Sequence, residues 1–177
     1  IIATPPELHH NIAMQVLTHK KNILITKPVA LNTKDAEEIH SFAIKQGVVA
    51  MVDHTFLFHP AITALVTNVQ SGIIGIPKTF YAEWLSRGKI QQEVDVIWDL
   101  APHPLSILLE FWEFPIDVSC QVHDKVDGVP SEASLFLNEK RTGNSAIIHV
   151  SWMDGGKSRM FKIRGSHNTV VFDDTNE

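Results

Sequence analysis

Short apolar runs alternate with helical apolar stripes in the first half of the chain. The runs cover residues 1–4, 23–25 and 48–52. In the two segments between them, apolar residues recur every three or four positions, as on one face of a helix. These positions are Leu8, Ile12 and Val16, then Ala36, Ile39 and Ala43. The alternation of strand and helix predicts a parallel sheet, and a further helix is predicted from Pro60 to Gly72.

After residue 76 the pattern changes to short strands separated by turn residues. The predicted strands are 78–85, 117–126, 132–137, 146–152, 159–164 and 169–172. In the second of these, Val118, Cys120 and Val122 alternate with polar neighbours, which predicts one buried face with the Cys120 thiol inside. One apolar helix, 105–112, interrupts the strands. We expect an open-faced antiparallel sheet with a helix packed on it, and a boundary near 76–77.

Composition narrows the class of protein. Of 177 residues, 44% are hydrophobic and 20% charged, as in ordinary globular domains. The excess of 20 Asp and Glu over 15 Lys and Arg disfavours a nucleic-acid partner, which usually meets a basic stripe. No apolar run approaches the roughly 18 residues of a membrane helix, so we expect no membrane partner. A lone cysteine cannot form an internal disulfide, which favours a reducing compartment.

Lys27 is the first candidate for chemistry. It directly follows an apolar strand and precedes Pro28. Ligands of open parallel sheets bind beyond the carboxyl ends of the strands, so a lysine there is well placed for a cofactor or substrate. A solvated lysine in a loop fits the same position.

Asp99 and His103 form the second candidate, because residues four apart point from one helix face. A carboxylate that orients an imidazole makes a general base, although an ion pair with an incidental histidine has the same spacing. Two prolines complicate the helix. Either it begins near Ala101, or Pro104 kinks it.

The other candidate groups are two pairs of histidines and one basic loop. The histidines match no common zinc signature, and we expect no metal; they are His9 with His10, and His54 with His59. The basic loop Arg87-Gly88-Lys89 fits a phosphate contact or a solvated loop. The glycine fingerprint of dinucleotide-binding proteins does not occur in these residues.

Several motifs together resemble the Gfo/Idh/MocA family of NAD(P)-dependent oxidoreductases, which act mostly on sugars, polyols and nucleotide sugars. They occur in the family's order, at 3–9, 25–31, 72–75 and 98–103, with later similarity at 150–153, 157–159 and 173–174. The resemblance implies a partial α/β Rossmann-type parallel sheet followed by an α+β domain with an open-faced, mostly antiparallel sheet.

By this resemblance, residues 1–76 are the C-terminal part of a Rossmann-like dinucleotide-binding domain. Residues 77–177 are a substrate and oligomerisation domain that is incomplete. The family's glycine fingerprint is expected upstream of Ile1. We expect a cytoplasmic protein, and a homo-oligomer that assembles through the open-faced sheet, because such a sheet needs a cover and self-association commonly provides one.

The resemblance also implies site residues. His103 takes the proton of a substrate hydroxyl, Asp99 orients it, and Lys27 hydrogen-bonds the reacting oxygen. The positions that line the cofactor, NAD or NADP, are Thr4, Pro5, His9, Lys27 and Pro28. The expected partner is a small sugar-like substrate, with Arg87 and Lys89 as contacts for it.

Two residues differ from the family pattern. Thr26 stands where the family usually has Glu, and Pro104 stands where an Asp often follows the histidine. The stretch 95–107 is most similar to members that oxidise nucleotide sugars. The alternative to a dehydrogenase is an impaired or truncated member that serves as a sheet-mediated oligomerisation module.

Overall fold

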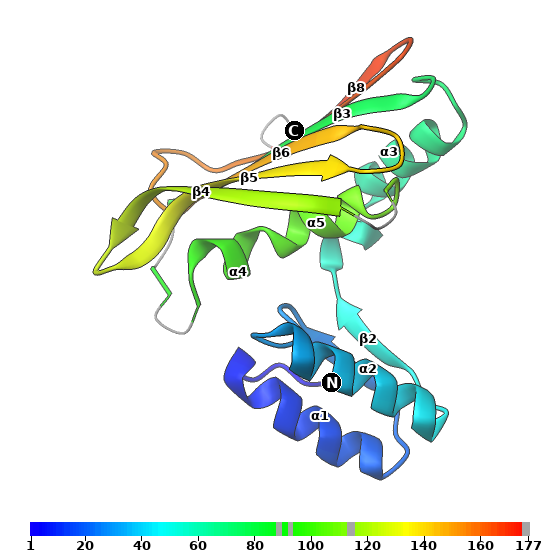
Figure 1. Cartoon of the computed structure of the whole chain (residues 1–177), viewed down its shortest axis with the longest axis vertical. Helices are drawn as coiled ribbons and strands as arrows, with labels where there is room; N and C mark the ends of the chain where they lie inside the picture. The colour runs from blue at the N-terminus through cyan, green and yellow to red at the C-terminus, as the bar shows by residue number, and fades with distance from the viewer. Residues whose placement is uncertain (88–89, 92–93, 113–115, 175–177) are drawn as a thin grey trace. The chain divides into compact units, whose positions relative to one another are not determined.

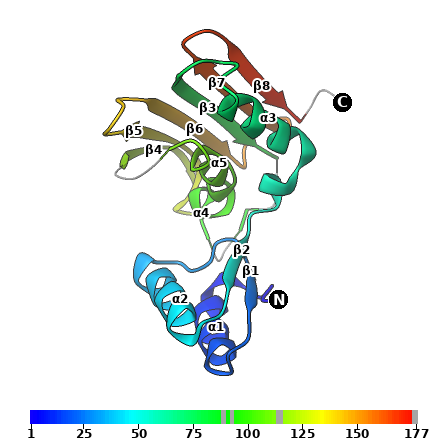
Figure 2. The ribbon, with the colours of Figure 1, turned by 90° about the vertical axis from the view of Figure 1, so that its right-hand side faces the viewer.

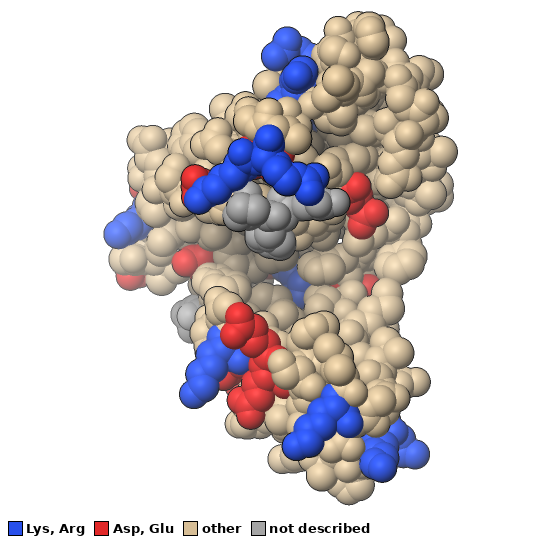
Figure 3. All heavy atoms as spheres, turned by 45° about the vertical axis from the view of Figure 1, so that its right-hand side comes forward, with Lys and Arg blue, Asp and Glu red and all other residues tan. Residues whose placement is uncertain are grey.

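The computed structural model describes residues 1–87, 90–91, 94–112 and 116–174, which form two compact units. The units are Ile1–His54 and Thr55–Glu177. The domain boundary predicted at 76–77 stays a prediction. Helix α3, Pro60–Gln70, buries Ile62, Leu65 and Val69 in the core of the second unit. Figure 3 shows one face of the molecule, where basic and acidic side chains are scattered over a largely neutral surface.

The first unit alternates strand and helix as predicted (Figure 2). Its elements are the 3-10 turn η1, Pro6–Leu8, then α1, His9–Thr18, β1, Ile23–Thr26, α2, Thr33–Gln46, and β2, Ala50–Asp53. Strands β1 and β2 pair in parallel, and Ile2 forms a parallel bridge to Ile25 on the other side of β1. The prediction of a parallel sheet is therefore confirmed.

Local signals set the limits of α2. The Asn32 side chain accepts a hydrogen bond from the Asp35 amide at 2.9 Å, which caps the helix start. Gly47 ends the helix at φ 68°, in the left-handed region that favours glycine. Residues 48–52 form an apolar run, which is typical of a buried strand, but β2 is only partly buried. Within residues 1–54, β2 pairs with β1 alone, so Val49 and Met51 remain 60% and 42% exposed.

The second unit is built on six strands. They are β3, Pro77–Leu85, β4, Ile116–Val126, β5, Val129–Glu139, β6, Ser145–Ser151, β7, Ser158–Gly165, and β8, Thr169–Asp173. Their order is β4-β5-β6-β3-β7-β8. Only the β3–β6 pair is parallel among these strands, so the predicted mostly antiparallel sheet is confirmed.

Helices cover one face of this sheet (Figure 1). They are η2, Thr55–Phe58, α3, α4, Val96–Leu100, and α5, Pro102–Leu108. Trp84, Ile148 and Phe161 point into the layer between sheet and helices, where they are almost fully buried. Among the described helices, none is long and apolar enough to cross a membrane.

The predicted burial of Cys120 is wrong. Cys120 is exposed, and Val118 beside it is 59% exposed. The reason is the position of β4 at the edge of the sheet, where it pairs with β5 alone among the described strands. Partial burial and the charge of Asp95 raise the pKa of the Cys120 thiol, which keeps it in its less reactive protonated form.

Candidate functional site

Three polar residues follow the two parallel strands and the parallel bridge of the first unit. Thr4 comes after the bridge at Ile2, Lys27 after β1, and His54 after β2. Carboxyl ends of parallel strands meet at one edge of a sheet, so these residues share the edge where ligands bind. The sequence alone does not place His54 with Thr4 and Lys27, because its spacing from His59 suggests only a metal ligand.

Two atoms at this edge are buried without a hydrogen-bond partner among the described residues. They are Oγ1 of Thr4 and Nδ1 of His54. Burial lowers the pKa of His54, and the nearby Asp53 carboxylate opposes part of this effect. A buried polar atom that has no hydrogen-bond partner among the described residues is suited to bind a polar ligand.

His9 connects two of the predicted cofactor-binding segments. Its ring is fully buried at the start of α1. Nδ1 lies 2.8 Å from the Pro28 carbonyl oxygen, and Nε2 lies 2.9 Å from the Thr4 carbonyl oxygen. Lys27 is half-buried, Pro28 is buried and the Lys27–Pro28 peptide is cis, whereas Pro5 is exposed. The structure thus gathers these positions within the first unit.

Asp99 and His103 belong to two successive short helices rather than to one. Asp95 caps α4 by accepting hydrogen bonds from the amides of Ile97 and Trp98. Helix α5 begins at Pro102, where a missing amide proton breaks no helix bond. The structure therefore selects the first of the two alternatives, a helix that starts near Ala101.

The Asp99 and His103 side chains are both half-buried beneath the sheet. The indole nitrogen of Trp152 donates to Oδ2 of Asp99 at 3.0 Å. The His103 ring stacks on Trp84, with centroids 5.5 Å apart, and meets the Phe56 ring edge-on at 5.2 Å. Hydrogen bonding holds the carboxylate, and aromatic packing holds the imidazole.

A cation lies against the same aromatic rings. The Arg159 guanidinium is 5.2 Å from the Phe56 centroid and 5.6 Å from the Trp84 centroid. Asp174 accepts a hydrogen bond from this guanidinium at 3.3 Å. Sequence reasoning missed these aromatic neighbours. Trp84 lies on strand β3 and Phe56 lies in the 3-10 turn η2, and in the sequence both look like ordinary core residues.

The remaining predicted residues are placed as follows. Lys27 belongs to the first unit, whereas Asp99 and His103 belong to the second. Arg87 is exposed after the end of β3, and Lys89 lies outside the described residues. The substrate contacts predicted at Arg87 and Lys89 therefore stay predictions.

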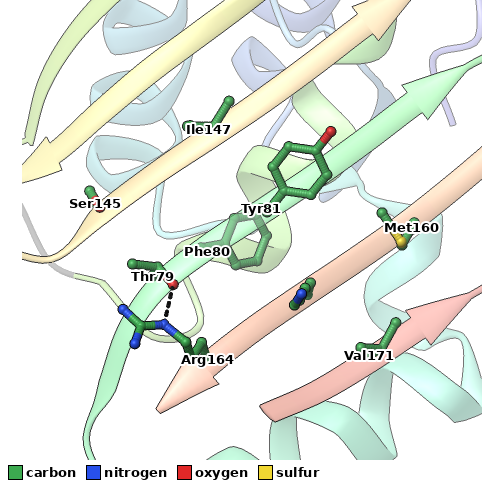
Figure 4. Close-up of a pocket in the computed structure, with 9 residues that line it drawn as sticks. Thr79, Phe80, Tyr81, Ser145, Ile147, Met160, Arg164 and Val171 are labelled. Atoms are coloured by element: carbon green, nitrogen blue, oxygen red, sulfur yellow. Dashed lines mark hydrogen bonds between the residues drawn. The ribbon is translucent and has the colours of Figure 1, made fainter. Parts of the chain in front are cut away.

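The face of the sheet away from the helices carries a shallow hollow of about 520 Å³ (Figure 4). Its rim includes Tyr81, Ile147 and Val171, which come from three different strands. The Tyr81 hydroxyl donates to Glu83 at 2.5 Å, and burial together with this carboxylate raises the pKa of Tyr81 to about 12. The tyrosine therefore acts here as a neutral hydrogen-bond donor.

Comparisons with known proteins agree with the predicted resemblance. Residues 1–54 match the model of a family described as "Oxidoreductase family, NAD-binding Rossmann fold". Over 166 residues the chain is 31% identical to the UDP-N-acetylglucosamine 3-dehydrogenase of Acidithiobacillus ferrooxidans, an alignment that covers 90% of this chain and 51% of the relative. It is 27% identical to the scyllo-inositol 2-dehydrogenase (NADP(+)) of Bacillus subtilis, over 97% of this chain and 56% of the relative.

A solved structure of the Acidithiobacillus ferrooxidans UDP-N-acetylglucosamine 3-dehydrogenase superposes with a TM-score of 0.88 at 28% identity. The match covers 99% of this chain and 55% of the solved one. The chain spans about half the length of the curated relatives it matches.

Proposed function

The chain belongs to the Gfo/Idh/MocA family of oxidoreductases, and we propose that the complete protein transfers a hydride between a sugar-like alcohol and NAD(P). The observation that carries this proposal is the setting of Asp99 and His103. The half-buried imidazole of His103 packs on Trp84 and Phe56. The Asp99 carboxylate, on the preceding helix α4, accepts a hydrogen bond from Trp152. A fixed acid and base in apolar surroundings suit proton transfer.

Each residue has one task in this proposal. His103 removes the proton from the substrate hydroxyl, while the C–H bond of the same carbon breaks and the alcohol becomes a carbonyl. Asp99 stabilises the imidazolium that forms on His103. Lys27 hydrogen-bonds the oxygen as it changes from hydroxyl to carbonyl. Bound NAD(P) supplies the acceptor for the hydride.

The first unit has features that fit such a cofactor. The edge at Thr4 and Lys27 lies beyond the carboxyl ends of parallel strands, where nucleotides bind in this class of sheet. Oγ1 of Thr4 is buried there without a partner among the described residues, and a carboxamide group can supply the missing hydrogen bond. We assign Thr4, Pro5, His9, Lys27 and Pro28 to cofactor binding.

The proposed substrates are sugars, polyols and nucleotide sugars. The relatives named above act on a nucleotide sugar and an inositol. The similarity of residues 95–107 to family members that oxidise nucleotide sugars favours a nucleotide sugar as the substrate. Arg87 and Lys89 remain proposed contacts for its phosphates. The lone cysteine fits a reducing compartment, and we propose a cytoplasmic location.

The test is NAD(P)⁺ reduction by the complete purified protein with a panel of UDP-sugars, free sugars and inositols. We expect reduction with at least one member of the panel. His103→Gln keeps a polar side chain of similar reach but removes the base, and should abolish that turnover. Failure of the wild-type protein to bind NAD⁺ or NADP⁺ would overturn the proposal.

We also propose that a second copy of the chain covers the open face of the sheet. Phe136, Ile147 and Val171 are 37%, 40% and 53% exposed on that face. Apolar residues gathered on one face are typical of a protein interface. Both the dehydrogenase and the alternative, an oligomerisation module, use this contact.

Sedimentation equilibrium of the complete protein tests the contact. Ile147→Asp places a charge on the open face and should yield monomers. Met153→Asp is the matched control, because Met153 is 47% exposed in the loop after β6. A wild-type monomer, or an Ile147→Asp variant that assembles like wild type, would contradict the proposal.

A further inference from the structure

His54 carries a buried polar atom that the described residues leave unsatisfied. Its Nδ1 is covered, yet it has no hydrogen-bond partner among them. An unpaired polar atom shielded from water costs free energy, so such an atom is typically met by a ligand or a bound water. Because the residue as a whole is only half-buried, a ligand at this position can reach the ring.

His54 lies in one row with Thr4 and Lys27, past the ends of segments that run side by side (Figure 2). The rung that crosses these segments consists of Ile2, Ile25 and Val52. Each of the three polar residues comes two positions after its member of this rung. Lys27 is therefore in the middle, with Thr4 one strand spacing, about 4.8 Å, to one side and His54 one spacing to the other.

The order along this row gives each position a different neighbour in the proposed reaction, and this inference rests on that proposed function. The cofactor carboxamide is proposed to lie at Thr4, and the reacting oxygen at Lys27. The cofactor then occupies the Thr4 side of the reacting oxygen. The His54 side is left for the rest of the substrate.

The chemistry of an imidazole nitrogen selects the group that meets it. Nδ1 donates a hydrogen bond when it carries a proton and accepts one when it does not. A carbonyl oxygen only accepts and an ammonium group only donates, so each of these fits one form of the ring. A hydroxyl both donates and accepts, and it satisfies Nδ1 in whichever form the ring adopts. Sugars and polyols carry hydroxyls on the carbons next to the one that is oxidised.

We propose that His54 is a specificity-determining residue: its Nδ1 hydrogen-bonds a second hydroxyl of the substrate, on a carbon next to the one that is oxidised. The residue thereby favours sugars and polyols with adjacent hydroxyls over alcohols that have only one. It takes no part in proton or hydride transfer, which stays with His103, Lys27 and the cofactor.

The experiment uses the complete protein and the panel member that it oxidises. This substrate is compared with analogues that each lack one hydroxyl next to the oxidised carbon. In wild type, kcat/KM should be at least about tenfold lower for one of these analogues, because the analogue leaves Nδ1 unpaired. His54→Phe keeps a flat ring without a hydrogen-bonding atom, and the difference between substrate and analogue should shrink to about twofold or less.

Two further variants guard against a merely structural effect. His54→Asn keeps a short polar group that can donate and accept, and should retain part of the discrimination. His40→Phe is the matched control, because His40 is exposed on α2 in the same unit, and it should discriminate like wild type. Calorimetry should give the same NADH affinity in wild type and in His54→Phe.

The outcomes separate the two proposals. Wild-type protein that oxidises no panel member contradicts the proposed function, and the role of His54 falls with it. Normal oxidation with equal discrimination in wild type and His54→Phe contradicts the role of His54 alone, and means that a water meets Nδ1. A loss of NADH affinity in His54→Phe would place the residue at the cofactor and also overturn the inference.

Discussion

Replacing Trp152 with Phe removes the N–H that holds Asp99 while it keeps an aromatic ring in the core. Trp152 is 2% exposed, and its indole donates to Oδ2 of Asp99 at 3.0 Å. A hydrogen bond to a charged group is worth about 1.5–3 kcal/mol. The smaller ring adds about 1 kcal/mol through lost apolar burial. We therefore expect the free energy of unfolding to fall by roughly 2.5–4 kcal/mol.

Two assays separate the effect of the lost hydrogen bond from the effect of the smaller ring. Urea unfolding compares Trp152→Phe with Trp112→Phe, which removes the same ring area from the same core, where Trp112 is 6% exposed. Only Trp152→Phe should also lower kcat, by about tenfold, because Asp99 then orients His103 less well. Equal losses of stability in the two variants, together with an unchanged kcat, would refute the reasoning.

Other predictions concern the rest of the second unit and the α2 terminus. Phe161→Ala, at a fully buried ring packed on Trp84, should lower the free energy of unfolding by about 3–5 kcal/mol, measured by urea. Gly165→Ala should lower the melting temperature more than Gly47→Ala, because its Cβ would lie 2.0 Å from the Ile74 carbonyl oxygen, whereas Gly47 has open space and only a positive φ to strain. Equal losses would contradict this account. Hydrogen bonds from the Thr142 hydroxyl and from the amides of Arg141 and Thr142 hold the pKa of Glu139 below its usual 4.5, so its contribution to stability is present above that pH and is lost as the pH falls through the lowered value. Thermal unfolding of Glu139→Gln should therefore differ from wild type at neutral pH and converge with it in acid.

Hydrophobic periodicity predicted much of the fold. Strand alternation and helix caps, such as Asn32 and Gly47, depend on local sequence, so their positions follow from a few neighbouring residues. The place where the two units divide could not be predicted in the same way. Whether α3 joins the first or the second core depends on which sheet buries Ile62 and Leu65, and its amphipathic pattern is the same in both cases.

The same distinction between local signals and distant contacts applies to the candidate site residues. Lys27, Asp99 and His103 could be proposed as candidates because strand ends and residue spacing are visible in the sequence. The partner of Asp99 could not, since Trp152 lies 53 residues away and meets it only after the sheet has formed. Edge position explains the error at Cys120, because alternation predicts which way a side chain points but not whether anything covers it.

The central claim is that His103 is the base for hydride transfer in the complete protein. The most direct measurement is single-turnover formation of NAD(P)H in wild type and in His103→Ala, with cofactor affinity measured alongside. We expect unchanged cofactor affinity and hydride transfer at least about 100-fold slower in the variant. Hydride transfer at the wild-type rate in His103→Ala would contradict the claim.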